Sequence, residues 1–193
     1  MRRTSASPTQ QEAAILKAAA EEVALVGVGR LSMEVIARQA GVSRSTLYRR
    51  FPSRDALVTE LGRQTFEFAM ARLQTVEIDS GPAEAAVAAF REGIRLLTGE
   101  PVMRRFLQLD GDFTAVAGMF DEARAFLTSA ATAMAKALRA AGATMPDNDL
   151  LAVAELHIRL AASLVQVSTP VLDVTDDDAV AAYARTHLAP LVR

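Results

Sequence analysis

Four arginines and a cluster of hydroxyl side chains lie in the short stretch SRSTLYRRFPSR, residues 43–54. Arginine presents a planar fork of donors that pairs with guanine edges or with phosphate. Hydroxyls and backbone amides near a helix N-terminus contact phosphate oxygens. The stretch therefore predicts contact with double-stranded DNA. The candidate DNA-binding residues are Ser32, Ser43, Arg44, Ser45, Thr46, Tyr48, Arg49, Arg50 and Arg54.

Two short amphipathic helices around a glycine turn must position these side chains. Ser32 can cap a first helix that ends at Ala40, because apolar residues recur there every three or four positions. Gly41 supplies the permissive backbone for a sharp turn, and Ser43 can cap the second helix. Pro52 ends that helix. The layout predicts a helix-turn-helix whose second helix reads the major groove.

The stretch resembles the DNA-binding motif of the tetracycline-repressor-like (TetR) family of transcriptional regulators, over about residues 10–62. The matching residues are Ile36, Ala37, Ala40, Gly41, Val42, Ser43, Leu47, Tyr48, Phe51, Pro52, Ser53, Arg54 and Leu57. The resemblance implies that Tyr48 and Arg54 clamp the DNA backbone, Arg54 standing where lysine is more common. It also implies that Arg44 and Thr46 face the groove.

The charge is divided unevenly along the 193 residues. Residues 1–63 carry ten Lys and Arg against six Asp and Glu, a net of +4, whereas residues 64–193 carry eleven against seventeen, a net of −6. A basic module beside an acidic one is typical of a protein with one end that approaches phosphates.

Composition narrows the class of protein further. Hydrophobic residues make up 51% and charged residues 23%, which is ample for a packed core. The absence of cysteine excludes disulfides and thiolate metal sites. Residues 4–12 are polar, so we expect neither a signal peptide nor a membrane anchor, and a cytoplasmic protein.

The periodicity predicts an all-α fold of about nine helices. We expect an N-terminal helix-turn-helix DNA-binding domain over residues 1–53 and a C-terminal effector-binding and dimerisation domain over 54–193. Thr9 is the expected cap of the first helix, and Asp147 or Asn148 that of the eighth. The expected helices are 10–26, 33–40, 44–51, 53–76, 82–98, 101–109, 114–141, 147–168 and 176–188.

The helix expected over residues 150–167 is apolar around its whole circumference, and such a helix must be covered on every side. A second copy of the chain, packed in an isologous four-helix arrangement, would cover the remaining face. Glu155, His157, Arg159 and Gln166 interrupt the helix and disfavour a membrane span. A homodimer would read a palindromic operator. The expected interface residues are Leu156, Leu160, Leu164, Val180, Tyr183 and His187.

The family resemblance also implies a small hydrophobic effector bound in the C-terminal domain. Large flexible apolar side chains shape adaptable pockets, but the same residues at helical spacing also suit a simple core. A histidine such as His157 is more often a satisfied core or interface residue than a ligand contact. We expect Arg95 and Arg105 to be solvated. The candidate pocket residues are Phe66, Met70, Phe90, Met103, Phe106, Leu107, Phe113, Met119, Phe120 and His157.

An enzyme is disfavoured, because the two histidines lie far apart, cysteine is absent and no glycine-rich phosphate loop follows a strand. We expect no cofactor and no metal. The sequence favours a ligand-responsive DNA-binding regulator, a repressor released from its operator by the effector. The alternative is a helical protein-interaction or ligand-carrier module without DNA binding, which would not require arginines on an exposed helix face.

Overall fold

The computed structural model describes residues 7–74, 81–107, 117–167 and 170–193; for residues 107 and 117–123 it describes the backbone alone. These residues form nine α-helices and no strand, which confirms the predicted all-α class. The helices are α1 Pro8–Val26, α2 Met33–Gln39, α3 Arg44–Arg50, α4 Arg54–Leu73, α5 Pro82–Gly99, α6 Pro101–Leu107, α7 Ala117–Ala140, α8 Asp147–Gln166 and α9 Asp177–His187.

Two predicted helix caps were wrong. Ser7, not Thr9, caps α1: its hydroxyl accepts from the Gln10 amide at 3.2 Å, and the Gln10 side chain accepts from the Ser7 amide at 2.8 Å. This reciprocal capping box, with Pro8 in the first turn, satisfies two backbone donors at once. At α8 the capping position is Pro146, and no side chain caps the helix. Asp147 instead lies in the first turn, where its charge favours the helix dipole.

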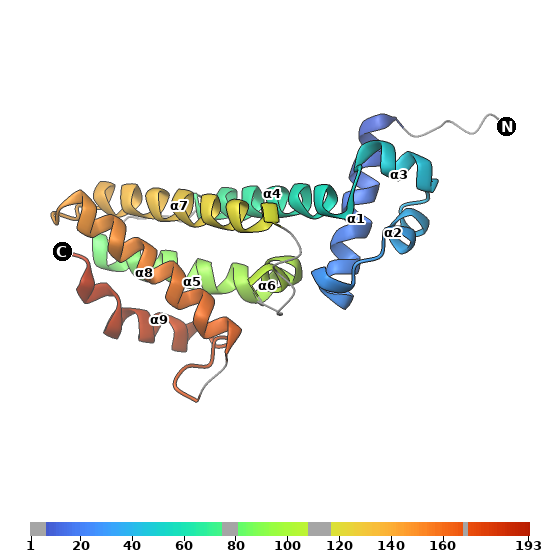
Figure 1. The fold of residues 1–193 in the computed structure, drawn as a ribbon. Helices are drawn as coiled ribbons and strands as arrows, with labels where there is room; N and C mark the ends of the chain where they lie inside the picture. The colour runs from blue at the N-terminus through green and yellow to red at the C-terminus, as the bar shows by residue number, and fades with distance from the viewer. Residues whose placement is uncertain (1–6, 75–80, 108–116, 168–169) are drawn as a thin grey trace.

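A small head and an elongated body are joined by α4 (Figure 1). Helices α1, α2 and α3 make the head, and α4 runs from the head into the body beside α7. One hydrophobic cluster continues through this join. It begins with Ile15, Ile36 and Leu47 in the head and reaches Met103 and Phe106 in α6.

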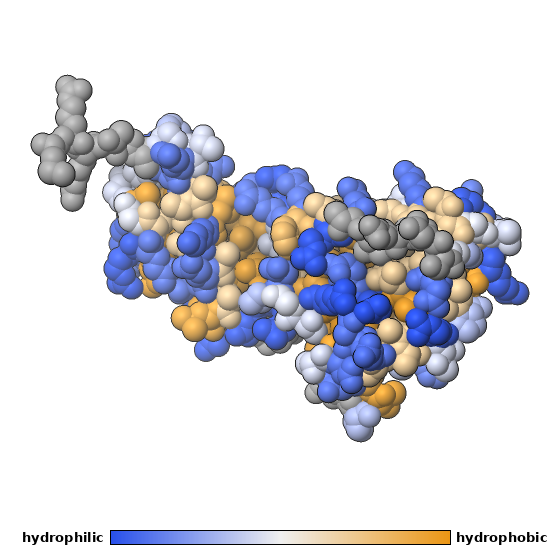
Figure 2. All heavy atoms as spheres, turned by 180° about the vertical axis from the view of Figure 1, so that it is seen from behind, coloured by the Kyte–Doolittle hydropathy of each residue, from blue (hydrophilic) through white to orange (hydrophobic). Residues whose placement is uncertain are grey.

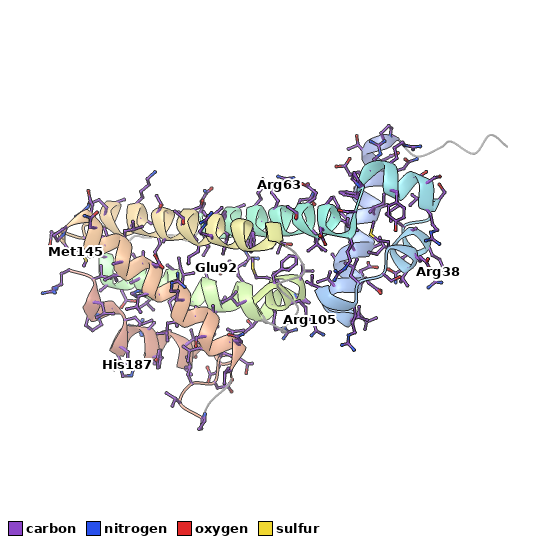
Figure 3. The ribbon with its side chains drawn as sticks, viewed as in Figure 1. Arg38, Arg63, Glu92, Arg105, Met145 and His187 are labelled. Atoms are coloured by element: carbon purple, nitrogen blue, oxygen red, sulfur yellow. The ribbon has the colours of Figure 1, made fainter. Side chains whose placement is uncertain are left out.

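The head also meets the body directly, through α1 and α6. The Arg105 side chain donates to the carbonyl oxygens of Ala24 and Leu25 at 3.3 and 3.4 Å. It thereby supplies hydrogen bonds to carbonyl groups in the last turn of α1, which have no partner within the helix. The expectation that Arg105 is solvated was therefore wrong (Figure 3). Figure 2, seen from behind, shows apolar residues at the surface where head and body meet; Phe68 lies in a groove there.

Helix α5 holds α9 at both of its ends. At one end Asp177 pairs with Arg91 and, bidentately at 2.8 Å, with Arg95. At the other end Arg185 donates to both carboxylate oxygens of Glu84 at 2.9 and 3.0 Å. Arg95 is exposed, as expected, and it also pairs with a carboxylate distant in sequence.

Glu92 extends this set of charges to α4. Its carboxylate is 2.5 Å from the Arg72 guanidinium of α4 and 3.8 Å from that of Arg95. Glu92 is only 9% exposed and lies inside the body, between α4 and α5 (Figure 3). A buried carboxylate needs partners, so this pairing fixes the body end of α4 against α5.

Asp177→Asn tests the connection between α5 and α9. The guanidinium groups of Arg91 and Arg95 lower the pKa of Asp177 below its ordinary value. The ion pairs therefore stabilise the fold at pH values above those at which aspartate carboxyl groups titrate. That contribution is lost as the pH falls through the lowered folded-state pKa. We expect the variant to lose about 1 kcal/mol or less of unfolding free energy at about pH 7 and to approach wild type as the pH falls below the lowered pKa of Asp177, measured by urea unfolding. Asp178→Asn is the control; an equal loss there would contradict this role.

Candidate nucleic-acid interface and internal cavity

The turn between α2 and α3 is built by short-range hydrogen bonds. Gly41 adopts φ +66°, a left-handed conformation that a side chain would strain. The amide of Val42 donates to the Ala37 carbonyl at 3.0 Å and closes the turn. The Ser43 hydroxyl accepts from the Thr46 amide at 3.1 Å, which caps α3. The two helices are thus fixed in the arrangement that the sequence predicted.

Helix α3 buries one side and presents the other. Leu47 is its buried residue, and Phe51 follows it into the head core. Tyr48 is 42% exposed, and Arg49 on the same helix is exposed as well. Three more of the predicted DNA-binding residues are exposed: Ser43, Arg44 and Ser45. Three others are half-buried: Thr46 and Arg50 on α3, and Ser32, which caps α2. Most outward side chains of α3 are therefore not covered by the protein itself.

Arg44 is held across the turn by α2. Its guanidinium lies 2.8 Å from the Glu34 carboxylate, and both side chains are largely exposed. Next to it, the Ser43 hydroxyl lies 2.9 Å from those of Ser45 and Thr46. An exposed pair of this kind is weak, so a phosphate or base edge can replace Glu34 as the partner of Arg44.

Arg54 differs from its neighbours, because its guanidinium is turned inward. It donates to the carbonyl oxygen of Val28, and its Nε is buried without a hydrogen-bond partner. The bond ties the start of α4 to the turn that follows α1. A phosphate contact by Arg54, as the resemblance implies, would require this bond to break, and the contact stays a prediction.

A cavity of about 260 Å³ lies in the body, between α4, α5, α6, α7 and α8. Of the predicted pocket residues, Phe90, Met103 and His157 line it. Half of the other sixteen described lining residues are alanine or glycine, a signal that the search for large side chains missed. The sixteen are Ala69, Leu73, Gln74, Ala85, Ala89, Gly93, Leu96, Leu97, Phe126, Ala130, Ala133, Met134, Ala137, Leu138, Ile158 and Ala161.

The remaining pocket candidates lie elsewhere. Phe66 and Met70 border a separate, shallower hollow, and Phe66 also packs into the core, stacked on Phe126 with ring centroids 4.6 Å apart. Phe106 is buried in the cluster that joins head and body. Phe113 lies outside the described residues, as do the side chains of Leu107, Met119 and Phe120.

His157 is the buried polar side chain of this cavity wall, and it is only 1% exposed. Its Nδ1 lies 2.7 Å from the Val153 carbonyl oxygen, one turn earlier in α8. Its Nε2 is buried without a hydrogen-bond partner. Desolvation by burial lowers the pKa of His157, so the ring is neutral near pH 7.

The predicted interface residues lie in different surroundings. Leu156 is 49% exposed, and Leu160 and Leu164 are half-buried on the same helix. His187 is exposed on the outer side of α9 (Figure 3). Tyr183 is half-buried and stacks on Phe90. Val180 is 1% exposed in the chain's own core and is not available to a partner, so its assignment to the interface is corrected.

Two further classes of site were sought in the described part of the chain. None of its helices combines the length and apolar character that crossing a membrane requires. Nor do its histidines and carboxylates form a group of three or more suited to a metal ion.

Comparison with known proteins places this geometry among bacterial regulators. The model of the family "bacterial regulatory proteins, tetR family" matches residues 15–61. An HTH-type transcriptional regulator of Mycobacterium bovis is 28% identical, over 90% of this chain and 89% of its own. Among solved structures, Salmonella enterica GusR has a TM-score of 0.75 at 21% identity, over 98% of this chain and 99% of its own. A TetR-family regulator from Mesorhizobium loti has a TM-score of 0.74 at 15% identity, over 96% of each chain.

Arg49→Ala tests the exposed face of α3. We expect DNA affinity to fall about tenfold and the slope of log K against log salt concentration to shrink by about one, because one phosphate contact is lost. Affinity is measured on duplexes that the wild-type protein selects from random sequence.

Lys17→Ala is the matched control, because it removes one positive charge from α1, where Lys17 lies 4.0 Å from Glu21. It should leave the salt dependence unchanged. Equal effects of the two substitutions, or none from Arg49→Ala in a folded protein, would contradict the assignment of α3.

Proposed function

We propose that this chain, which belongs to the tetR family of bacterial regulatory proteins and is a DNA-binding transcriptional regulator, acts as a homodimeric repressor that a small apolar effector releases from a palindromic operator. The family model and the relative agree with the predicted family, and both describe regulators rather than enzymes. The observation that carries the proposal is a physical connection: α4 begins at Arg54, shortly after α3 ends at Arg50, and its last turn lies in the wall of the cavity.

The head supplies the contacts to DNA in this proposal. Tyr48 and Arg49 are exposed on α3, and Arg44 needs only to leave Glu34 to reach a base edge or a phosphate. The hydroxyl of Ser43 bonds to those of Ser45 and Thr46 at the start of the helix, where hydroxyl groups can instead donate to phosphate oxygens.

Regulators of this family bind DNA and dimerise, and we assign the partner contact of this chain to α8 and α9. Leu156 and Val167 remain exposed along one side of α8, and the half-buried Leu160 lies between them. Exposed apolar side chains in a row favour a second protein surface over water. A two-fold partner would place two α3 helices one or more turns of B-DNA apart, which suits a symmetric operator.

The cavity supplies the switch. Ala69 and Leu73 of α4 and Met103 of α6 line it, and both helices also contact α1. Because the walls of the cavity are packed against the rest of the core, a molecule that pushes these residues apart changes the positions of α4 and α6. It then weakens DNA binding by its difference in affinity for the two arrangements.

Leu156→Glu tests the dimer. We expect a folded protein with the mass of a single chain in sedimentation velocity, because a carboxylate in an apolar interface loses its hydration. Leu25→Glu is the matched control, since Leu25 is an exposed leucine of the head, and it should leave the mass at two chains. A wild-type protein with the mass of one chain would contradict the proposed dimer.

Ala133→Phe tests the switch by placing a ring in the cavity wall. We expect it to mimic a bound effector and to lower DNA affinity by about tenfold, within the usual range of allosteric coupling. Ala140→Phe adds the same ring on an exposed position of α7 and should have no effect. If a crystal structure places the new ring in the cavity and DNA affinity is unchanged, the cavity does not control the head.

A further inference from the structure

The walls of the cavity are much longer along two helices than along the others. Its described lining residues extend from Ala85 to Leu97 on α5 and from Phe126 to Leu138 on α7, and each pair is twelve residues apart. At 1.5 Å of rise per residue, each stretch is about 18 Å long, whereas a cube of about 260 Å³ has an edge of about 6 Å. The cavity is therefore elongated along α5 and α7.

These two helices run antiparallel along the space (Figure 1). The start of α5 lies beside the end of α7, because Ala85 and Leu138 belong to one hydrophobic cluster. At the other end of the cavity, Leu96 belongs to the cluster that continues into the head, and Phe126 packs against that cluster. The cavity thus reaches from one packed cluster to the other.

Small side chains line the middle of both helices. They are Ala85, Ala89 and Gly93 on α5 and Ala130, Ala133 and Ala137 on α7. Residues three or four positions apart share one face of a helix, so each set forms a stripe along its helix. Alanine and glycine project little beyond the backbone, and the two stripes leave a long slot between the helices.

Gly93 is the position in this slot that packing explains least. It lies inside α5, where glycine is a poorer helix former than any residue except proline. A Cβ atom added to it would meet nothing within 4 Å. The packing of the chain against itself therefore does not require a glycine here, and the room that Gly93 leaves is part of the cavity.

We infer that the molecule bound here carries an unbranched alkyl chain of about ten carbons, which lies lengthwise between α5 and α7 and passes over Gly93. A cavity of about 150 Å³ holds the six carbons of benzene, so about 260 Å³ holds about ten carbons at the same ratio. Extended at about 1.2 Å per bond, such a chain is about 11 Å long, which fits the lined length of the slot. This inference rests on the proposed function, because it specifies the effector of the same cavity.

The test uses straight-chain alcohols from butan-1-ol to dodecan-1-ol, with dissociation constants measured by calorimetry on the full chain. We expect about fourfold tighter binding for each added methylene group, because each is buried, and no further gain beyond about ten carbons, where the slot ends. The branched isomer 3,7-dimethyloctan-1-ol should bind about tenfold more weakly than decan-1-ol, because its methyl branches meet the walls.

Gly93→Leu tests where the chain lies. The leucine side chain would cross the slot between its ends, so we expect affinity to stop rising at about six carbons. Gly99→Leu is the matched control, because Gly99 is exposed at the end of α5, outside the cavity, and an added Cβ there also meets nothing within 4 Å. This control should keep the limit at about ten carbons.

Contacts in the wild-type protein keep the test decisive even if Gly93→Leu does not fold. Nuclear Overhauser effects from bound decan-1-ol should reach both Leu138 at one end of the cavity and Met103 at the other. Contacts at one end alone, equal binding of the two isomers, no binding of any alcohol, or an unchanged limit in folded Gly93→Leu would overturn the inference.

A parallel series of straight-chain carboxylates distinguishes a fatty acid from an alcohol as the source of the chain. The same limit of about ten carbons in either series supports the inference.

DNA binding measured in the same samples separates this inference from the proposed function. If the limit in chain length is found but decan-1-ol and decanoate do not release DNA, the inference holds and the proposed switch fails. If the straight and branched isomers bind equally and both release DNA, the switch holds and the elongated ligand is overturned.

Discussion

One close-packed cluster of side chains is shared by the head and the cavity, and the mechanism depends on it. Ala69, Leu96 and Met103 line the cavity and also belong to the hydrophobic cluster that contains Ile15 and Leu47 of the head. A packed interior deforms little, so a ligand that displaces any of these three residues also displaces the cluster behind them. The reading surface and the cavity are therefore two sides of one core rather than two independent modules.

Charged contacts decide which parts of the body respond. Asp177 and Glu84 tie both ends of α9 to α5, so these two helices form one unit. Arg72 fixes the body end of α4 to Glu92, whereas the head end of α4 is held to the head by Arg54. Since α4 has twenty residues and spans about 30 Å, a small rotation about its Arg72 end becomes a displacement of ångströms at the head. In the proposed switch, a local change at Ala69 or Leu73 would thus change the position of α3.

Sequence reasoning found the features that are local and missed those that are not. Caps, a glycine turn and apolar periodicity specify α2 and α3 within a few residues of each other, so the helix-turn-helix was predicted with its boundaries. The partners of Arg95 and Arg105 lie about eighty residues away in the chain, and no local pattern reveals such pairs. The cavity was only partly predicted, because a cavity exists where side chains are small, and alanines such as Ala133 look like ordinary helix residues.

In the proposed function, helix α8 lies between the effector and the partner, and its two sides show how one helix could contact both. His157 and Ala161 face the cavity, whereas Leu156 is exposed on another side of the same helix. The outer side can remain constant while the inner side binds a ligand, because the bond from His157 to Val153 lies within α8 and α5 holds α9 in place beside it. If the partner contact stays fixed, the free energy of ligand binding would mainly move α4 and α6, the cavity helices that contact the head. In the proposed switch, the dimer contact on α8 and α9 would then stay in place while the two heads move relative to it.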